Sequence, residues 1–172
     1  MSLRTTVKDA TRAVSKAFNG EDAVDDDILD TLKKEHEEVA DLLDKLEKSE
    51  SAPQRRSLVL QIRKALIPHV KAEQTVVYDA VIALKAKDAK IDGHEGYIEH
   101  ELASRTLDQL GKIKNAASPE HKAAGKVLRE LITHHVEEEE RNIWKDVKEN
   151  FSDDDRAAMN SAFLAAKKKV KA

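Results

Sequence analysis

Apolar residues recur along most of this chain every three or four positions, the spacing of one face of an α-helix. Between residues 26 and 48 this spacing contains one seven-residue gap. The gap becomes a regular four-plus-three step only if His36 belongs to the same face. The face then comprises Leu29, Leu32, His36, Val39, Leu43 and Leu46. The pattern predicts a helix that directs a histidine toward the protein core.

Three further segments show the same spacing, and each has a histidine on its apolar face. The face of the second helix comprises Leu58, Ile62, Ala65, His69, Glu73, Val76 and Ala80. That of the third comprises Tyr97, His100, Ala103, Leu107, Leu110 and Ile113. That of the fourth comprises Ala124, Leu128, Leu131, His135, Glu139 and, less regularly, Ile143 and Val147. Connections are expected at residues 49–53 and 85–93 and before Ser118-Pro119-Glu120, a sequence typical of a helix start. Short connections between long helices make antiparallel neighbours, so we predict an all-α, up-down-up-down four-helix bundle.

Two features modify this simple bundle. Pro68 lies inside the second helix, where a proline removes a backbone hydrogen bond and costs about 3 kcal/mol. We therefore expect a kink directly before His69. Segments also flank the bundle, so we divide the chain into an N-terminal arm or short helix (residues 1–25), the bundle (26–150) and a C-terminal helix with a basic tail (151–172).

Composition agrees with a helical protein and excludes several classes of function. Hydrophobic residues make up 40% of the chain and charged residues 37%, with opposite charges interleaved and a net charge of only −3. The absence of cysteine excludes disulfides, thiolate catalysis and iron–sulfur ligation. We find neither a nucleic-acid-binding pattern nor an apolar stretch that would span a bilayer. We expect a cytoplasmic monomer or homodimer with no nucleic-acid or membrane partner.

The polar residues on the apolar faces form an internal duplication. His-x3-Glu occurs twice, as His69 with Glu73 and as His135 with Glu139, and this spacing puts both side chains on one helix face. A lone histidine within Glu-His-Glu precedes each of them, at His36 and at His100. The same set of side chains is therefore expected at matching points of two half-molecules.

The combination of these motifs indicates metal. A single histidine on an apolar face is more often a hydrogen-bonded core residue, and a single His-x3-Glu is more often a surface pair. Two core-facing carboxylates need a cation, however, and no lysine or arginine shares their faces nearby. Four imidazoles and two carboxylates without thiolate favour iron, manganese or zinc over calcium or magnesium. Because six side chains exceed the needs of one tetrahedral zinc, we predict two ions, each held by one histidine pair and bridged by Glu73 and Glu139.

These motifs resemble the hemerythrin-like proteins with the HHE cation-binding domain. The resemblance covers about residues 26–150 and rests on EHEEVADLLDKL, HVKAEQTVVYDA, EHELASRTLDQL and HHVEEEERNIW. It implies a non-haem centre of two iron ions with an oxo or hydroxo bridge, for which zinc or manganese would be substitutes. The ligands that it implies are His36, His69, Glu73, His100, His135 and Glu139.

One departure from the family pattern bears on function. Oxygen-carrying hemerythrins use a fifth histidine, from a His-x3-His pair on the third helix. Here Gly96 and Ser104 occupy the places four residues before and after His100. The chain therefore looks more like the bacterial members that are associated with oxygen, peroxide, nitric oxide or iron.

The remaining histidines, His94, His121 and His134, are predicted not to be ligands. Tyr97 has two interpretations, a hydroxyl that faces the metal or a core aromatic with a solvated hydroxyl.

Four other side chains near the motifs receive predictions. Tyr78 and Trp144 each follow a repeat histidine by nine residues and are predicted to be packing residues at the end of the bundle. Glu138 and Glu140 are predicted to be solvated, with one of them a candidate hydrogen-bond partner of a ligand imidazole.

Three functions are compatible with the sequence. The first is a di-iron protein that binds or turns over O2, H2O2 or NO, with catalase-like or peroxidatic activity as one form and an oxygen- or iron-responsive role as another. The second is a non-catalytic metal-binding sensor, storage or partner-interaction module. The third is a scaffold bundle with a vestigial site.

Overall fold

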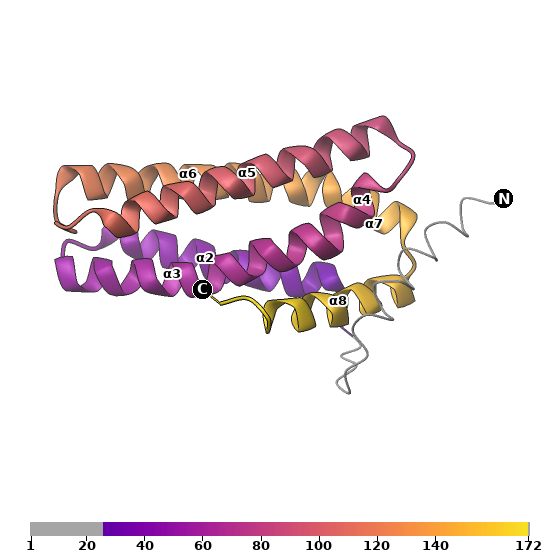
Figure 1. Ribbon diagram of the computed structural model, residues 1–172, viewed down its shortest axis with the longest axis horizontal. Helices are drawn as coiled ribbons and strands as arrows, with labels where there is room; N and C mark the ends of the chain where they lie inside the picture. Colours follow the sequence, from indigo (N-terminus) through magenta and orange to yellow (C-terminus); the bar gives the residue numbers. More distant parts are fainter. Residues whose placement is uncertain (1–25, 172) are drawn as a thin grey trace.

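The protein is an antiparallel four-helix bundle with short helical extensions at one end (Figure 1). A computed structural model describes residues 26–171, so the predicted N-terminal arm lies outside the described residues. The four long helices are α2 (Ile28–Lys48), α3 (Ala52–Glu73), α5 (Lys87–Lys112) and α6 (Pro119–Arg141). The π-helical turn η1 (Gln74–Tyr78) and α4 (Asp79–Ile82) prolong α3, α7 (Ile143–Asn150) follows α6, and α8 (Asp153–Lys167) packs on α3 and α2. The predicted fold is confirmed.

Side-chain caps start the helices where the sequence indicated. The Asp27 carboxylate accepts from Leu29 N at 2.9 Å, and the Ser118 hydroxyl accepts from His121 N at 3.1 Å. At the start of α8, Ser152 and Asp155 form a reciprocal capping box. Each cap satisfies amide groups that have no partner within the helix.

The predicted connection at residues 85–93 is wrong, because α5 already begins at Lys87. Gly93 was predicted to be the last residue of this connection, but Gly93 and Gly96 are both buried inside α5. A Cβ on Gly93 would lie 2.6 Å from Ile82 Cγ1, and one on Gly96 would lie 2.6 Å from the ring of Tyr78. These glycines therefore permit close packing of α5 against η1 and α4.

Pro68 lies inside α3, which continues past it to Glu73. The helix departs from α-helical hydrogen bonding at η1, a π-helical turn that the sequence pattern did not predict. Such turns insert extra backbone into a helix and are often found at functional sites.

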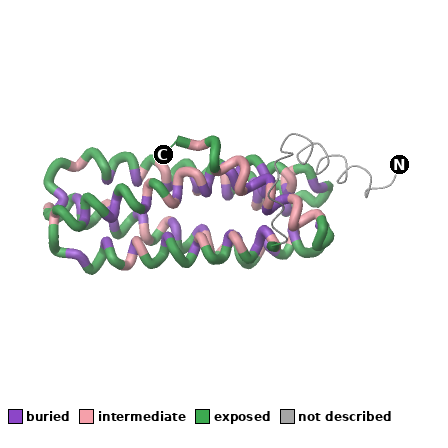
Figure 2. Tube along the Cα trace, turned by 90° about the horizontal axis from the view of Figure 1, so that it is seen from below, coloured by how far each residue is buried: buried purple, intermediate pink, exposed green. Residues whose placement is uncertain are grey.

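A polar layer divides the hydrophobic core into two clusters. One cluster joins α4, α7 and α8 to the ends of α2 and α3, and the other fills the opposite half of the bundle. Figure 2 shows buried positions recurring along each long helix. On the inner face of α6, Ile132 is buried where Leu131 was predicted, and Leu131 is half-buried. The predicted histidines and glutamates lie between the two clusters.

Polar residues also close the end of the bundle that lies at the α2–α3 turn. Arg55 is 1% exposed and donates to the backbone oxygens of Leu46, at 2.5 Å, and Ser49, at 3.0 Å. Its Nη2 lies 3.1 Å from Nδ1 of His121, which is also buried. His121 therefore has a structural partner away from the polar layer.

Among the described helices, none combines the length and the apolar character that a membrane crossing requires.

Candidate metal centre

The structure brings all six predicted side chains together in the polar layer. His36 comes from α2, His69 and Glu73 from α3, His100 from α5, and the last pair from α6. Every one of them is at most 6% exposed. The six residues are His36, His69, Glu73, His100, His135 and Glu139.

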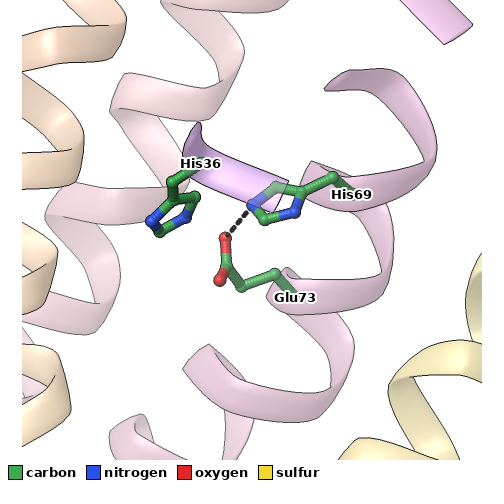
Figure 3. Close-up of side chains that lie close together, drawn as sticks. All are labelled: His36, His69 and Glu73. Carbon is green, nitrogen blue, oxygen red and sulfur yellow. Dashed lines mark ion pairs between the residues drawn. The ribbon is translucent and has the colours of Figure 1, made fainter. Parts of the chain in front are cut away.

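Two groups of donor atoms lie close enough for each to surround one ion. The atoms of His36, His69 and Glu73 lie within 4.8 Å of one another, and so do those of Glu73, His100 and His135. Figure 3 shows the first group, in which side chains from α2 and α3 converge. Glu73 belongs to both groups, which is the position that a bridging carboxylate requires.

Each carboxylate contacts one histidine from each half of the molecule. Glu73 Oε2 lies 3.2 Å from Nε2 of His69 and 3.4 Å from Nε2 of His100. Glu139 Oε2 lies 3.3 Å from Nε2 of His135 and 3.7 Å from Nε2 of His36. The two halves of the duplication therefore meet through these two carboxylates.

Several inward atoms have no hydrogen-bond partner. These atoms are Nε2 of His36, both carboxylate oxygens of Glu73 and Nδ1 of His100. The Glu73 contacts with His69 and His100 are close approaches, at 3.2 and 3.4 Å, that do not align as hydrogen bonds. A buried carboxylate without hydrogen bonds is costly, whereas a cation between the two histidine pairs satisfies it. The donor set therefore fits a pair of metal ions.

Outer carboxylates orient three of the histidines. Glu35 accepts from Nδ1 of His69 at 3.0 Å, and Glu99 accepts from Nδ1 of His135 at 2.7 Å. A carboxylate on Nδ1 fixes the imidazole so that Nε2 faces the metal. Neither residue was predicted from the sequence, although each is the first glutamate of a Glu-His-Glu motif. That repeated glutamate was the signal available in the sequence.

The third outer carboxylate, Glu140, is one of the two candidates predicted from the sequence. Glu140 Oε1 lies 3.4 Å from Nδ1 of His36. Glu138 instead forms an ion pair with Arg141.

Without a bound cation, the carboxylates hold protons on two of the imidazoles. Burial alone would lower the pKa of His135, but Glu139 and Glu99 outweigh it and raise the pKa to about 10. Burial also lowers the pKa of His69, but the carboxylates of Glu73 and Glu35 have the larger effect and raise it to about 9. Burial, together with the charge of His135, lowers the pKa of His100 to about 4. The positive charges of His69 and His135 therefore balance the buried carboxylates when no cation is bound.

The prediction for Tyr78 is wrong, because its hydroxyl reaches the cluster beside His100, His135 and Glu139. Its hydroxyl lies 3.3 Å from Nε2 of both His100 and His135 and 3.4 Å from Glu139 Oε2. A π-helical turn has more residues per turn than an α-helix, so Tyr78 stays on the side of the helix that carries Glu73. Apolar spacing carries no signal for this turn.

Trp144 also lies beside the cluster rather than in packing contacts alone. Its Nε1 donates to Glu139 Oε1 at 3.3 Å, and its ring stacks on His36 with centroids 6.0 Å apart. Burying the indole here excludes water from one side of the cluster.

Tyr97 faces away from the cluster. Its hydroxyl donates to Gln74 O at 3.0 Å and to Asp79 Oδ1 at 2.8 Å. The interpretation of Tyr97 as a hydroxyl that faces the metal is therefore wrong, and the hydroxyl binds protein atoms of η1 and α4. His94 and His134 are exposed.

An opening beside α5 connects the cluster with the surface. Its inner part is lined by Tyr78, Gly96, His135 and Glu139. Its outer part carries the acidic side chains of Asp92, Glu95, Glu99 and Glu138. Such a lining attracts cations and repels anions.

Comparisons with known proteins show which family the chain belongs to. A DNA nickase from Nostoc sp. is 30% identical over 169 residues, which are 95% of this chain and 47% of that protein. The chain thus spans about half the length of this curated relative. No solved structure matches the chain. The model of the hemerythrin HHE cation-binding domain matches residues 27–145, a range that contains all six residues of the cluster. The chain therefore belongs to the hemerythrin HHE cation-binding domain family.

Proposed function

We propose that the chain holds two iron ions at this centre and binds or turns over O2, H2O2 or NO there. One ion would lie between His36 and His69 and the other between His100 and His135, with Glu73 and Glu139 shared. The observation that supports this most strongly is that each carboxylate contacts one histidine from each half. Six side chains that serve two ions in this way leave coordination positions for a small ligand.

The surrounding residues would support such a centre. Bound iron would supply ligand-binding and electron-transfer chemistry. Glu35 and Glu99 hold His69 and His135 by their Nδ1 atoms, and Trp144 and Phe163 cover the cluster with apolar surface. Because the six side chains are almost fully buried, diatomic molecules and peroxide fit the site better than an organic substrate.

Reconstitution tests this proposal. Metal-free protein is loaded with Fe(II) under anaerobic conditions and then exposed to O2, H2O2 or NO. We expect new ligand-to-metal absorption bands and, with peroxide, its consumption. A protein that carries both His69→Ala and His135→Ala should show neither response. Wild-type protein that holds two iron ions but changes no spectrum and consumes no peroxide would contradict the proposal.

A non-catalytic metal-responsive role is the alternative within the same family. The polar layer lies between two separate apolar clusters, so metal binding would stabilise contacts along the whole bundle. A large metal-dependent rise in melting temperature without any reaction with O2, peroxide or NO would favour this alternative.

The name of the Nostoc relative raises DNA nicking as a further candidate. A DNA backbone cannot contact side chains that are at most 6% exposed, so direct hydrolysis at this centre is disfavoured. Nicking would instead require a diffusible oxidant formed from O2 or peroxide. Incubating iron-loaded protein with supercoiled plasmid, with and without added catalase, distinguishes these routes.

A further inference from the structure

We propose that the Tyr78 hydroxyl is a seventh protein ligand of the centre, bound to the ion that His100 and His135 hold. This inference rests on the proposed function, since it assigns a donor atom to one of the two proposed ions. It makes the two ions chemically different from each other.

The distances around Tyr78 are those of donors on one octahedral ion. With metal–ligand bonds of about 2.1 Å, neighbouring corners of an octahedron lie about 3.0 Å apart. Nε2 of His100 and Nε2 of His135 are 3.0 Å apart, and the Tyr78 oxygen is 3.3 Å from each. Glu139 Oε2 lies 3.4 Å from the Tyr78 oxygen and 3.3 Å from His135 Nε2. The Tyr78 oxygen and the two imidazole nitrogens therefore fit three adjacent corners of one coordination sphere, and Glu139 Oε2 lies beside two of these three atoms.

The fold holds the phenol firmly in this place. Tyr78 has no exposed surface, and its ring stacks on His100 with centroids 5.1 Å apart and an interplanar angle of 25°. On the other side the ring fills the space where a side chain on Gly96 would be, since a Cβ there would lie 2.6 Å from Cε2. The π-helical turn and Gly96 together direct the hydroxyl into the polar layer.

The internal duplication is broken at this position. Tyr78 and Trp144 each follow a repeat histidine by nine residues, and each stacks on the lone histidine of the other half, Tyr78 on His100 and Trp144 on His36. An indole is only a hydrogen-bond donor, whereas a phenol oxygen binds iron after losing its proton. On metal binding the phenol proton would be released by way of the acidic side chains of Glu99 and Glu138, which line the opening beside Tyr78. Only the ion beside His100 and His135 therefore gains an additional oxygen ligand.

The test uses the full chain loaded with iron, oxidised to Fe(III), and two matched variants. The protein has two tyrosines, and the hydroxyl of Tyr97 points to Gln74 and Asp79 instead of the cluster. Iron per chain is counted, and the phenolate-to-Fe(III) absorption band and its resonance Raman ring modes are recorded. We expect both signals in wild type and in Tyr97→Phe, in which Tyr78 is the sole tyrosine. Tyr78→Phe should lose both signals while it keeps two iron ions and its helical circular dichroism.

The outcomes separate this inference from the proposed function. Two bound iron ions without a phenolate signal in wild type, or a signal that persists in folded Tyr78→Phe, would show that Tyr78 only donates a hydrogen bond. If wild type binds no iron, the proposed function fails and this inference fails with it. If Tyr78→Phe does not fold, the Tyr97→Phe spectrum still decides, because its only phenol is Tyr78.

Discussion

Individual imidazoles in the polar layer lie between an outer and an inner carboxylate. His69 lies between Glu35 and Glu73, and His135 between Glu99 and Glu139. The outer contact uses Nδ1 and the inner one uses Nε2, so each ring has a fixed orientation before a metal binds. Preorganisation of this kind raises metal affinity without a change in the ligands themselves.

Replacing an outer carboxylate should therefore weaken metal binding. We expect Glu99→Gln to reduce iron affinity by about 10–100-fold, because a neutral amide accepts the Nδ1 proton of His135 less strongly and leaves Nε2 a weaker, less firmly oriented ligand. Glu101→Gln is the matched control, since Glu101 lies two residues away, is exposed and pairs with Arg105. Competition with a chelator measures both affinities, and equal affinities for the two variants would refute the role of Glu99.

The metal-free protein should lose stability at high pH. Against the effect of burial, Glu73 and Glu35 raise the pKa of His69 to about 9, and Glu139 and Glu99 raise that of His135 to about 10. Unfolded histidine has a pKa of about 6.5. A raised folded pKa gives stability that is fully present below about pH 6.5 and is lost as pH rises through 9 and 10.

Thermal unfolding by circular dichroism, in the presence of a chelator, measures this loss. We expect the melting temperature at pH 10 to lie below that at pH 7, with a smaller difference in His135→Gln. An equal or higher melting temperature at pH 10 would show that the two imidazoles are not protonated in the folded protein.

Among the helices, the contact of η1 with α5 determines where Tyr78 lies. Gly96 is the residue of α5 that makes room for the phenol ring. A glycine inside a helix normally costs about 1 kcal/mol relative to alanine, so replacing an ordinary helical glycine is expected to stabilise.

Gly96→Ala should instead lower the free energy of unfolding. Its Cβ would overlap the buried ring of Tyr78, and overpacking of this kind costs about 1–3 kcal/mol. Gly111→Ala is the control, because Gly111 is exposed near the end of the same helix and its Cβ would approach only Arg63, at 3.7 Å. Urea unfolding should show a loss for the first variant and a gain of about 0.5–1 kcal/mol for the second. A gain for both would mean that the ring moves aside freely.

The helix pattern also shows what sequence alone predicts here and what it does not. The four long helices and the inward histidines followed from the three-to-four spacing, because His36 completes an otherwise broken apolar face. The π-helical turn could not be predicted from this spacing, because Glu73, Val76 and Ala80 keep an ordinary α-helical spacing across it. The start of α5 was missed because Gly93, which permits close packing inside the helix, has the sequence appearance of a loop residue.

Across the bundle, the polar layer joins two apolar clusters and opens to the surface on one side. Glu35 and Glu99 were missed because each lies next to the apolar stripe of its own helix and contacts a histidine of the neighbouring one. Contacts between helices depend on how the helices pack, and the spacing of residues within one helix gives no information about that packing. The acidic opening is a feature of the same kind, since α5 and the α6–α7 segment line it together.

This opening should make metal uptake sensitive to charge. Burial and then the neighbouring Asp146, Asp88 and Glu138 raise the pKa of Asp92, which reflects the negative field there. We expect Asp92→Asn to slow Fe(II) uptake, and added salt to slow uptake by wild type, because salt screens attraction at the surface. Glu130→Gln, a change of the same charge at an exposed site on α6, should leave the uptake rate unchanged. Stopped-flow absorbance gives these rates, and an equal effect of both substitutions would exclude the opening as the route.

The most direct test of the centre itself is the number of iron ions per chain after anaerobic reconstitution and removal of excess metal. We predict two ions in wild type and a loss of this stoichiometric binding when His69→Ala and His135→Ala are combined. The same iron content in both proteins, or no bound iron in wild type, would contradict the account.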